Sequence, residues 1–445
     1  MNPAKVLALG FLIMILIGAL LLSMPFAAEK GITVTPFQAL FTATSAVCVT
    51  GLKVIETATS YSLFGELVIL CLIQLGGLGF MLFATSVLVL SGKRITLRNR
   101  MLLHETMSIP GLSGTVRLSI RFVLIVISVE IVGSIILAIR FVPIFGLWKG
   151  IYYGVFHAVS AFCNAGFDLF GAADSLTTFF TDPSVLLTVA ALIVIGGLGF
   201  AVLADIQSSG FRFRKLNLHS KIAIFMTGLL LISGLVFFTG VEWNNAGTLS
   251  RDAATTPQKL LNAFFQSVTT RTAGFNAIPQ NNLSDAGKLF SILLMFVGAS
   301  PASTGGGIKT TTIFVIFVLI KSVFKGRDDV YAFKKRLPLV LIRTSISIFF
   351  LGLMLLAAGL LFMEVSDQMS GFSSIDLLFE EASALGTVGL SVIGPENLTR
   401  QTQVWLMLLM FFGRVGPLTM MLSLTRRRSG NPQGVRYPEE QIIVG

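Results

Sequence analysis

Four short glycine-containing segments repeat one pattern along this chain. In each segment a Phe stands ten residues before a glycine, and Leu or Phe follows that glycine directly. The segments recur at intervals of roughly 110 residues, and such a period indicates that one structural unit occurs four times. They are FTATSAVCVTGL (Phe41–Leu52), FHAVSAFCNAGF (Phe156–Phe167), FFQSVTTRTAGF (Phe264–Phe275) and FEEASALGTVGL (Phe379–Leu390).

The chemistry that this pattern predicts is the coordination of a cation by backbone oxygen atoms. Glycine tolerates φ > 0, so a turn that contains it can direct successive carbonyls to one side. A monovalent cation gives up its water only where other oxygens replace it, and rings of neutral carbonyls do so without holding the ion too tightly. Four such turns around one axis would form a selectivity filter. The predicted filter residues are Val49, Thr50, Gly51, Asn164, Ala165, Gly166, Thr272, Ala273, Gly274, Thr387, Val388 and Gly389.

The elements that must position these turns are membrane helices. The chain of 445 residues is 54% hydrophobic and only 12% charged, which is more apolar than a soluble protein of this size. A transmembrane helix needs about 20 apolar residues, and two such stretches flank each glycine segment. The predicted spans are Val6–Met24, Leu63–Leu90, Leu118–Val142, Val185–Ala204, Ile222–Phe238, Leu289–Ile320, Leu339–Phe362 and Val404–Leu424.

The predicted fold is an all-α membrane protein. Four span–pore-loop–span repeats, with eight transmembrane helices, surround a central pore with pseudo-four-fold symmetry. Irregular backbone at membrane depth is tolerated only where protein buries it or where it lines a cavity, which fits re-entrant pore segments. No polar linker is long enough to separate soluble domains. We place the repeats at residues 1–95, 96–215, 216–330 (with a broken second helix) and 331–445 (with a cytoplasmic C-terminal tail).

Positive charge predicts the orientation of the chain. Three inter-repeat loops, the C-terminal tail and Lys5 hold most of the 33 lysine and arginine residues, and loops of this kind lie on the cytoplasmic side. Both termini are therefore expected in the cytoplasm, and the pore segments enter from outside. The net charge of +11 reflects this asymmetry and could also serve anionic lipid headgroups or an acidic cytoplasmic partner; it does not indicate nucleic acid. The basic residues are Lys93, Arg94, Arg98, Arg100, Arg117 and Arg121 in the first loop, Arg212, Arg214, Lys215 and Lys221 in the second, Lys321, Lys325, Arg327, Lys334, Lys335, Arg336 and Arg343 in the third, and Arg426, Arg427, Arg428 and Arg436 in the tail.

A second glycine pattern follows each predicted filter, within the next span. For GGLGF at Gly76–Phe80 and at Gly196–Phe200 we favour close helix packing, for which membrane helices commonly use small residues. The fourth copy is GRVGP at Gly413–Pro417. The third copy, GASPASTGGGIKTTT, combines a proline with three consecutive glycines, and a helix is not expected to continue through it.

The third copy therefore predicts a polar loop that interrupts its span in mid-membrane. If the repeats surround a pore, this loop lies below the filter, where it could obstruct the ion path and act as a gate. Lys309 would add an electrostatic barrier to another cation. The predicted gate residues are Gly298, Ala299, Ser300, Pro301, Ala302, Ser303, Thr304, Gly305, Gly306, Gly307, Ile308, Lys309, Thr310, Thr311, Thr312 and Arg414.

Arg414 and Glu130 are charged residues within apolar spans, and such residues are functional candidates by default. Arg414 either faces the cavity and repels cations or satisfies backbone carbonyls, for example those of the broken span. We favour the first alternative. For Glu130 we favour a buried hydrogen bond over a proton or ion relay.

With these residues in place, the chain resembles the superfamily of potassium transporters that includes the Trk, Ktr and plant HKT systems. The resemblance covers essentially the whole length, and the chain is most similar to the membrane subunit of a Ktr-type bacterial uptake system. It implies that the four filter glycines select K+, that Gly298–Thr312 is the intramembrane gating loop and that Arg414 assists the gate. Family members with Ser in the first segment tend towards Na+, so Gly51 favours K+.

The resemblance also implies partners and a location. It implies a homodimer with two separate pores in the plasma membrane of a bacterium, and a cytoplasmic ring of KtrA-like regulatory subunits. ATP or ADP is expected on that ring, because this chain shows no phosphate-binding loop. No covalent cofactor is expected; K+ is the substrate, with Na+ as a second ion.

Two other classes of function remain open from the residues alone. The first is a Na+-selective or nonselective cation pathway of the same architecture, because Lys53, Arg271 and Asp168 place charges of both signs near the filter. The second is an intramembrane enzyme, which we do not expect. The three histidines are scattered, and no spacing of Cys and His typical of a metal site occurs.

Overall fold

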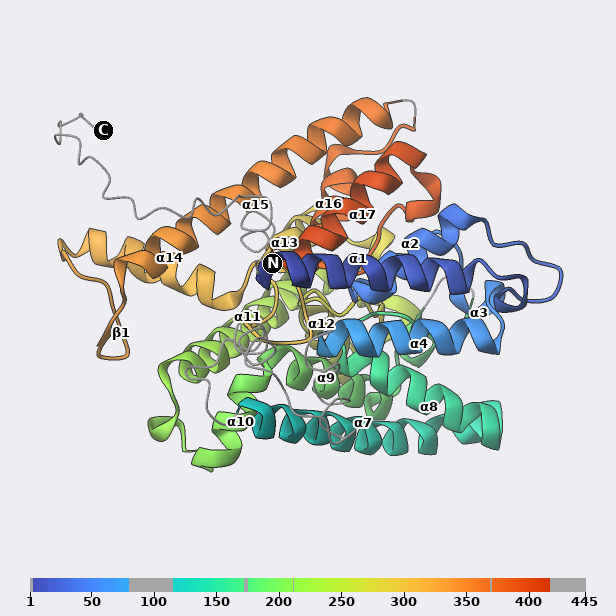
Figure 1. The fold of residues 1–445 in the computed structure, drawn as a ribbon, viewed down its shortest axis with the longest axis horizontal. Coiled ribbons are helices and arrows are strands. Elements are labelled where there is room, and N and C mark those ends of the chain that lie inside the picture. Colours follow the sequence, from blue (N-terminus) through green and yellow to red (C-terminus); the bar gives the residue numbers. More distant parts are fainter. Residues whose placement is uncertain (1–2, 80–114, 172–174, 211, 369, 417–445) are drawn as a thin grey trace.

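The computed structural model describes residues 3–79, 115–171, 175–210, 212–368 and 370–416. Within these ranges the chain is almost entirely helical, and the strands found there are β1 (Tyr331–Ala332) and β2 (Lys335–Arg336), which pair antiparallel. The predicted helical class is therefore confirmed (Figure 1). The predicted basic residues in 80–114 and 417–445, and the ends of the spans predicted at Leu63–Leu90 and Val404–Leu424, lie outside the described residues.

One order of elements recurs four times: a long helix, a short helix and a second helix. The long helices are α1 (Pro3–Leu22), α7 (Thr115–Phe145), α11 (Leu218–Glu242) and α15 (Leu339–Ser366). The short helices are α2 (Pro36–Val47), α8 (Leu147–Phe162), α12 (Thr256–Thr269) and α16 (Ser374–Gly386). The second helices are α4 (Leu63–Leu78), α9 (Pro183–Leu198) with α10 (Phe200–Ser209), α13 (Asp285–Phe296) with α14 (Thr310–Phe324), and α17 (Arg400–Val415). Smaller elements are α3 (Thr57–Ser60) and the 3-10 turns at Pro25–Ala27, Thr177–Phe179, Phe213–Lys215, Arg251–Ala253, Gln280–Asn282 and Pro395–Asn397.

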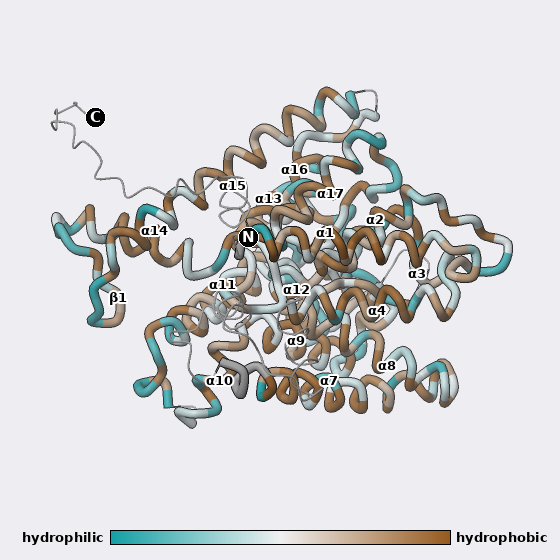
Figure 2. The backbone as a smooth tube through the Cα atoms, in the orientation of Figure 1, coloured by the Kyte–Doolittle hydropathy of each residue, from teal (hydrophilic) through white to brown (hydrophobic). Residues whose placement is uncertain are grey.

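The long helices present apolar side chains on the outside of the molecule. Leu20 is 64% exposed, Ile139 65% and Val236 66%. So much exposed apolar surface indicates a lipid environment, and Figure 2 shows the hydrophobic colour along these helices. Among the described residues, four helices are long and apolar enough to cross a membrane, or five if α9 and α10 count as one bent span. Two of the second helices are shorter because a break divides each of them, into α9 and α10 and into α13 and α14.

The short helices α2, α12 and α16 begin with side-chain caps, and all four short helices become buried towards their C-terminal ends. α2 begins after Thr35, which exchanges hydrogen bonds with Gln38 in a capping box. α12 begins in a similar way, since the Thr255 backbone N–H donates to the Gln258 side chain at 2.8 Å. The C-terminal half of each short helix is mostly buried, and no more than two residues separate the end of each helix from a predicted filter turn. The helix dipoles therefore place partial negative charge beside those turns.

The repeated elements pack in a closed order. Each long helix packs against its own short helix, in the pairs α1–α2, α7–α8, α11–α12 and α15–α16. The second helix of each unit then contacts the short helix of the next one: α4 contacts α8, α9 contacts α12, α13 contacts α16, and α17 returns to α2. The four filter turns are thereby held around a common centre.

A β-hairpin joins the interrupted third unit to the fourth. Its two turn residues, Phe333 and Lys334, have φ angles of 46° and 63°, the left-handed conformation that a two-residue hairpin turn of this type requires. The Phe333 ring contacts the rings of Phe225 and Phe314. The hairpin is thus fixed to α11 and α14.

Candidate functional site

All four predicted filter turns share one backbone conformation. Each glycine and the residue two positions before it have a positive φ, whereas the residue between them does not. A positive φ is uncommon outside glycine, and four such residues at equivalent positions mark a functional constraint. The φ angles are 96° at Gly51, 68° at Gly166, 79° at Gly274 and 93° at Gly389, with 56° at Val49, 60° at Asn164, 64° at Thr272 and 49° at Thr387.

Hydroxyl groups of the short helices hold the first and fourth turns. The Oγ atom of Ser45 accepts a hydrogen bond from the Gly51 N–H at 3.0 Å. Ser383 Oγ accepts the equivalent bond from the Gly389 N–H, also at 3.0 Å. The sequence indicated only small packing residues here. Both serines stand six residues before a filter glycine, and this shared position is the signal that could have predicted their hydrogen bonds to the turns.

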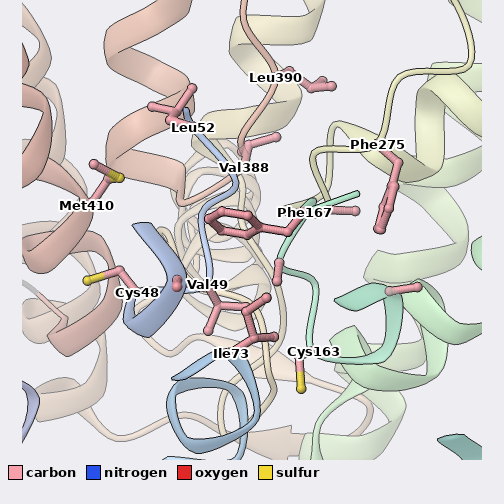
Figure 3. Close-up of a cluster of buried hydrophobic side chains, with 14 of the residues drawn as sticks. Cys48, Val49, Leu52, Ile73, Cys163, Phe167, Phe275, Val388, Leu390 and Met410 are labelled. Carbon is pink, nitrogen blue, oxygen red and sulfur yellow. The ribbon is translucent and has the colours of Figure 1, made fainter. Parts of the chain in front are cut away.

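In the second and third turns a hydroxyl donates to the residue after the glycine. Ser160 donates to the Phe167 carbonyl and Thr269 to the Phe275 carbonyl, each at 2.7 Å. The Leu or Phe that follows each filter glycine is buried and anchors its turn (Figure 3). These four anchors are Leu52, Phe167, Phe275 and Leu390.

The four glycines form a closed ring of contacts. Gly51 lies against Gly166, Gly166 against Gly274, Gly274 against Gly389, and Gly389 against Gly51. A Cβ atom added to Gly51 would stand 2.6 Å from the carbonyl oxygen of Ala165. The other three glycines face the equivalent carbonyl oxygens of the next turns, those of Ala273, Val388 and Thr50. Side chains are therefore excluded at all four positions, and the backbone itself lines the ring.

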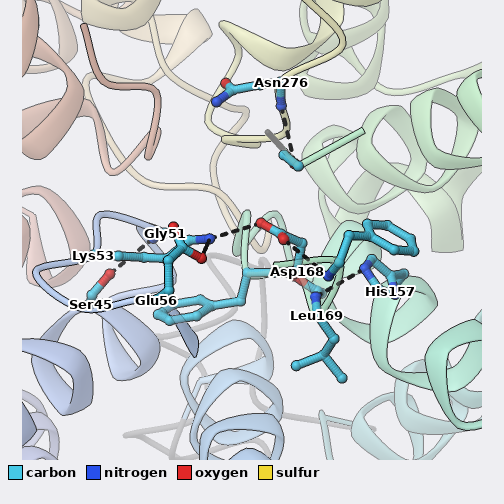
Figure 4. A network of polar contacts seen from close by, with 12 residues as sticks. Ser45, Gly51, Lys53, Glu56, His157, Asp168, Leu169 and Asn276 are labelled. Carbon is cyan, nitrogen blue, oxygen red and sulfur yellow. Dashed lines mark hydrogen bonds and ion pairs between the residues drawn. The ribbon is translucent and has the colours of Figure 1, made fainter. Parts of the chain in front are cut away.

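A cavity of about 430 Å³ opens on this ring, and all four glycines line it. Lys53, Glu56, Asp168 and Glu396 also line it, and we call it the mouth cavity. Lys53 Nζ donates to Asp168 Oδ2 at 2.9 Å and to Glu56 Oε2 at 3.5 Å (Figure 4). Burial disfavours the charge of Lys53, but the carboxylates of Asp168 and Glu56 outweigh this, so its pKa lies above the usual value. Burial raises the pKa of Glu396, and Glu56 adds to that rise.

Arg271, the other charge that the sequence placed near the filter, does not line the mouth cavity. It is 6% exposed and lies beside Ile193, Leu231 and Val268. Lys53 and Asp168 are therefore the pair that the fold brings together at the mouth.

The predicted interruption of the third unit is present. Residues 297–309 form no helix between α13 and α14, and Thr310–Thr312 form the first turn of α14. The Gly298 N–H donates to the Ile308 carbonyl at 2.9 Å, and this hydrogen bond holds the two ends of the loop together. We call residues 297–309 the intramembrane loop.

The intramembrane loop lies against the first residues of two filter turns. A Cβ atom on Gly305 would meet the hydroxyl of Thr272, and one on Gly306 would meet that of Thr387. Because the mouth cavity is at the glycine end of the turns, the loop is on their opposite side. Lys309 Nζ donates to the Gly305 carbonyl at 2.9 Å, so its ammonium group folds back on the loop.

Arg414 connects this loop to a different unit. Its guanidinium group donates to the carbonyl oxygen of Thr304 in the loop and to those of Gly76 and Gly77 at the end of α4. The geometry thus agrees with the second sequence alternative, in which Arg414 satisfies backbone carbonyls, including one of the broken span.

The other second helices also end at glycines, which the sequence analysis did not predict. Gly76 and Gly196 do pack closely, against the carbonyls of Val47 and Phe162. However, the span predicted at Val185–Ala204 is not continuous: α9 and α10 differ in direction by 93°, and Gly199 between them has a φ of 94°. α4 and α17 end in the same way, at Gly79 and Gly416, with φ angles of 79° and 90°.

Glu130 forms a buried hydrogen bond, as we favoured from the sequence. It is 7% exposed, and its Oε2 accepts from Gln74 Nε2 at 3.2 Å. Cys163 Sγ donates to the same Gln74 side chain at 3.4 Å. In the described part of the chain, no group of three or more His, Cys, Asp or Glu side chains could hold a metal ion.

Comparison with known proteins gives a consistent similarity over the whole chain. A sequence model of the TrkH family, described as cation transport protein, matches residues 5–432. Potassium/sodium uptake protein NtpJ from Enterococcus hirae is 38% identical over 446 residues, covering 100% of this chain and 98% of that protein. Ktr system potassium uptake protein B from Bacillus subtilis is 37% identical over 446 residues, covering 100% and 97%.

A solved structure shares the fold. The crystal structure of the potassium transporter TrkH from Vibrio parahaemolyticus superposes with a TM-score of 0.71, covering 94% of this chain and 84% of that one. The two sequences are 18% identical, so this likeness concerns the fold alone.

Proposed function

The chain belongs to the TrkH family of cation transport proteins, and from this premise we propose that it is the ion-translocating membrane subunit of a K+ uptake system. In this proposal K+ moves down its electrochemical gradient through the ring of filter turns. The protein moves an ion and carries out no covalent chemistry. Two relatives that match the whole chain are named as potassium or potassium/sodium uptake proteins, which supports K+ as the substrate.

The closed ring of four glycine turns is the observation that carries this proposal. The backbone of each turn alternates between positive and negative φ, and the next turn lies in direct contact. Carbonyl oxygens from four turns can therefore replace the hydration shell of a cation that has shed its water. The short helices add partial negative charge at the same place.

The intramembrane loop is the gate of the proposed pathway. It contacts Thr272 and Thr387 on the side of the filter away from the mouth cavity, and Arg414 holds it there. A loop without helical hydrogen bonds can move at lower cost than a continuous helix. We therefore expect conduction to require displacement of Gly305 and Gly306.

The proposed membrane topology has eight spans in four repeats. The closed packing order of the long, short and second helices supports it, as do the four long apolar helices. Both termini and the basic inter-repeat loops then lie in the cytoplasm of a bacterium, and the mouth cavity faces outward.

The proposed assembly is a homodimer with two pores, bound to a cytoplasmic ring of nucleotide-binding subunits. The name of the Bacillus subtilis relative, Ktr system potassium uptake protein B, describes one component of a system and so supports a further component here. ATP or ADP would bind that component. The alternative substrate is Na+, transported alone or together with K+. The name of the Enterococcus hirae relative, which includes both ions, supports this alternative.

The proposal is tested by K+ uptake in bacterial cells that lack their own K+ uptake systems. Cells that produce the full chain with its cytoplasmic partner should accumulate K+ and grow at low external K+. Excess external Na+ should compete weakly. Equal inhibition by Na+ would favour the nonselective alternative, and absence of K+ uptake from cells with normal amounts of the protein would contradict the proposal.

A further inference from the structure

The residues two positions after the four filter glycines meet at the mouth cavity. Because the four turns share one conformation, these residues occupy equivalent places around the ring. They differ in charge, since one is cationic, one is anionic and two are neutral. They are Lys53, Asp168, Asn276 and Ser391, and all four line the cavity.

Lys53 is held within this ring by carboxylates from two units. Its ammonium group lies 2.9 Å from Asp168 of the second unit and 3.5 Å from Glu56 of its own. The side chain of Lys53 is 19% exposed and that of Asp168 only 3%, so solvent screens this ion pair weakly. The position of the Lys53 amine is therefore fixed beside the path that leads to the glycines.

The mouth cavity would carry a strong negative charge without Lys53. Among the residues that the structure describes, three carboxylates line it, those of Glu56, Asp168 and Glu396, and Lys53 is the one lysine or arginine. Ca2+ prefers oxygen ligands, and several carboxylates gathered in one cavity supply them. A divalent cation that bound there would lie directly above the filter and block it.

We propose that the Lys53 ammonium serves as a built-in cation that occupies the carboxylates of the mouth cavity and thereby keeps divalent cations away from the filter. This inference rests on the proposed function, because it assigns a specificity role at the mouth of the same pathway. The single positive charge of Lys53 pairs with Asp168 and Glu56 and leaves a moderate net negative charge in the cavity. This net negative charge still attracts K+, which the neutral carbonyls of the ring then receive.

Replacement of Lys53 by Gln tests the role of the charge. External Ca2+ at millimolar concentration should leave K+ uptake by the wild type almost unchanged. In the Lys53→Gln variant, the Ca2+ concentration that halves uptake should fall at least tenfold. Lys53→Arg should resemble the wild type, and the double variant Lys53→Gln with Asp168→Asn should lose most of the new Ca2+ sensitivity. The matched control is Lys30→Gln, since Lys30 is exposed and does not line the cavity.

A binding measurement on purified protein separates this inference from the transport proposal. Ca2+ should raise the melting temperature of the Lys53→Gln variant and leave that of the wild type unchanged, because a ligand stabilises only a protein that binds it. This readout needs no transport activity. If Lys53→Gln and the wild type respond equally to Ca2+ in both assays, the inference is wrong even where K+ uptake is normal. If the wild type transports no K+, the proposed function is wrong, whatever the result of the Ca2+ binding measurement.

Discussion

The guanidinium group of Arg414 donates a hydrogen bond to the carbonyl oxygen of Thr304, and this bond joins the end of α17 to the intramembrane loop. The same guanidinium also bonds carbonyls at the end of α4. One side chain thus links the first, third and fourth units on one side of the filter. A planar group with several fixed donors can make these bonds together, which a lysine cannot.

Arg414→Gln should raise K+ flux in the absence of the cytoplasmic partner. The substitution removes charge-assisted hydrogen bonds, each of which contributes about 1.5–3 kcal/mol. If one such bond favours the closed position of the loop, basal flux should rise at least about tenfold. Flux of the purified full chain in liposomes, without partner, measures this effect. Arg414→Lys should raise flux as well, because the ammonium group cannot reach both sets of carbonyls.

The control for Arg414 is Arg140→Gln. Arg140 also forms a close ion pair, with Asp182 at 2.6 Å, but its side chain is half exposed and forms this pair outside the intramembrane loop. It should leave basal flux unchanged. Basal flux at the wild-type level in both Arg414 variants would show that the link to Thr304 does not hold the gate.

Shortening the intramembrane loop should also raise basal flux. Deletion of Ser303–Lys309 removes the residues that contact Thr272 and Thr387, so the obstruction beside the filter is lost. Deletion of Gly306 alone is the milder variant and leaves the hydrogen bond from Gly298 to Ile308 in place. Both should exceed the flux of Arg414→Gln in liposomes. Wild-type flux from a Gly306 deletion that purifies as a stable protein would contradict the gate assignment.

Serine at Gly51 or Gly274 should lower the preference for K+ over Na+. Both glycines have a positive φ, where a side chain costs about 1–3 kcal/mol, and an added Cβ would press on the carbonyl of the next turn. The ring should widen, and a wider ring holds K+ less selectively. K+ uptake in competition with Na+ measures this change. Gly240→Ser is the control, because Gly240 has ordinary backbone and open space around it; unchanged ion preference in both filter variants would refute the filter assignment.

The conformation of the four glycine turns and the break in the third unit could be predicted because each rests on a local signal. Glycine at one place in four repeated segments marks a backbone conformation, and the structure shows that conformation at Gly51 and its three equivalents. The run of glycines after Pro301 marks a break by the same reasoning. A single sequence carries such information wherever the backbone itself is the constraint.

Contacts between units could not be predicted from the sequence. Lys53 and Asp168 lie in different repeats, and only the closed ring brings them within 2.9 Å. Arg414 could either repel cations or bond backbone carbonyls, and the choice between these roles likewise depended on the position of the loop, which brings the Thr304 carbonyl to Arg414. The bend at Gly199 was missed for another reason, since a glycine in an apolar stretch fits both close packing and a break, and tertiary contacts decide between them.

Glu242→Ala should lower thermal stability without changing ion preference. Glu242 is fully buried at the end of α11, where it accepts hydrogen bonds from the backbone N–H and hydroxyl of Ser284 at 3.0 and 2.5 Å and from the Thr248 hydroxyl at 2.9 Å. Its loss leaves the fully buried Thr248 hydroxyl without this acceptor, at about 1–3 kcal/mol, and the partly buried donors of Ser284 add to this cost. The temperature at which half of the purified protein remains monodisperse should fall by several degrees. Glu364→Ala, at a partly exposed position on α15, should have little effect; equal melting temperatures for Glu242→Ala and the wild type would contradict this role.

Charge reversal in the hairpin of β1 and β2 should weaken activation by the proposed partner. Lys334 and Lys335 stand on the hairpin, and Lys325 directly follows α14, the helix that continues from the intramembrane loop. A partner can shift the gate only if it binds the two positions of the loop with different affinity. Phe333 ties the hairpin to Phe314 on α14, so a pull on the hairpin moves that helix.

Two variants separate docking on the hairpin from transmission through it. Substitution of Lys325, Lys334 and Lys335 by Glu should weaken partner binding at least about tenfold and reduce activation in parallel, because like charges then oppose each other across the contact. Phe333→Ala should leave binding near the wild-type level but reduce activation, since the hairpin then loses the contact of the Phe333 ring with Phe314 on α14. Pull-down and K+ flux measured on the same preparations distinguish these outcomes, with Lys30→Glu as the charge-reversal control. Full binding and full activation in the triple variant would place the contact on another cytoplasmic surface, and full activation in Phe333→Ala would show that the hairpin does not transmit it.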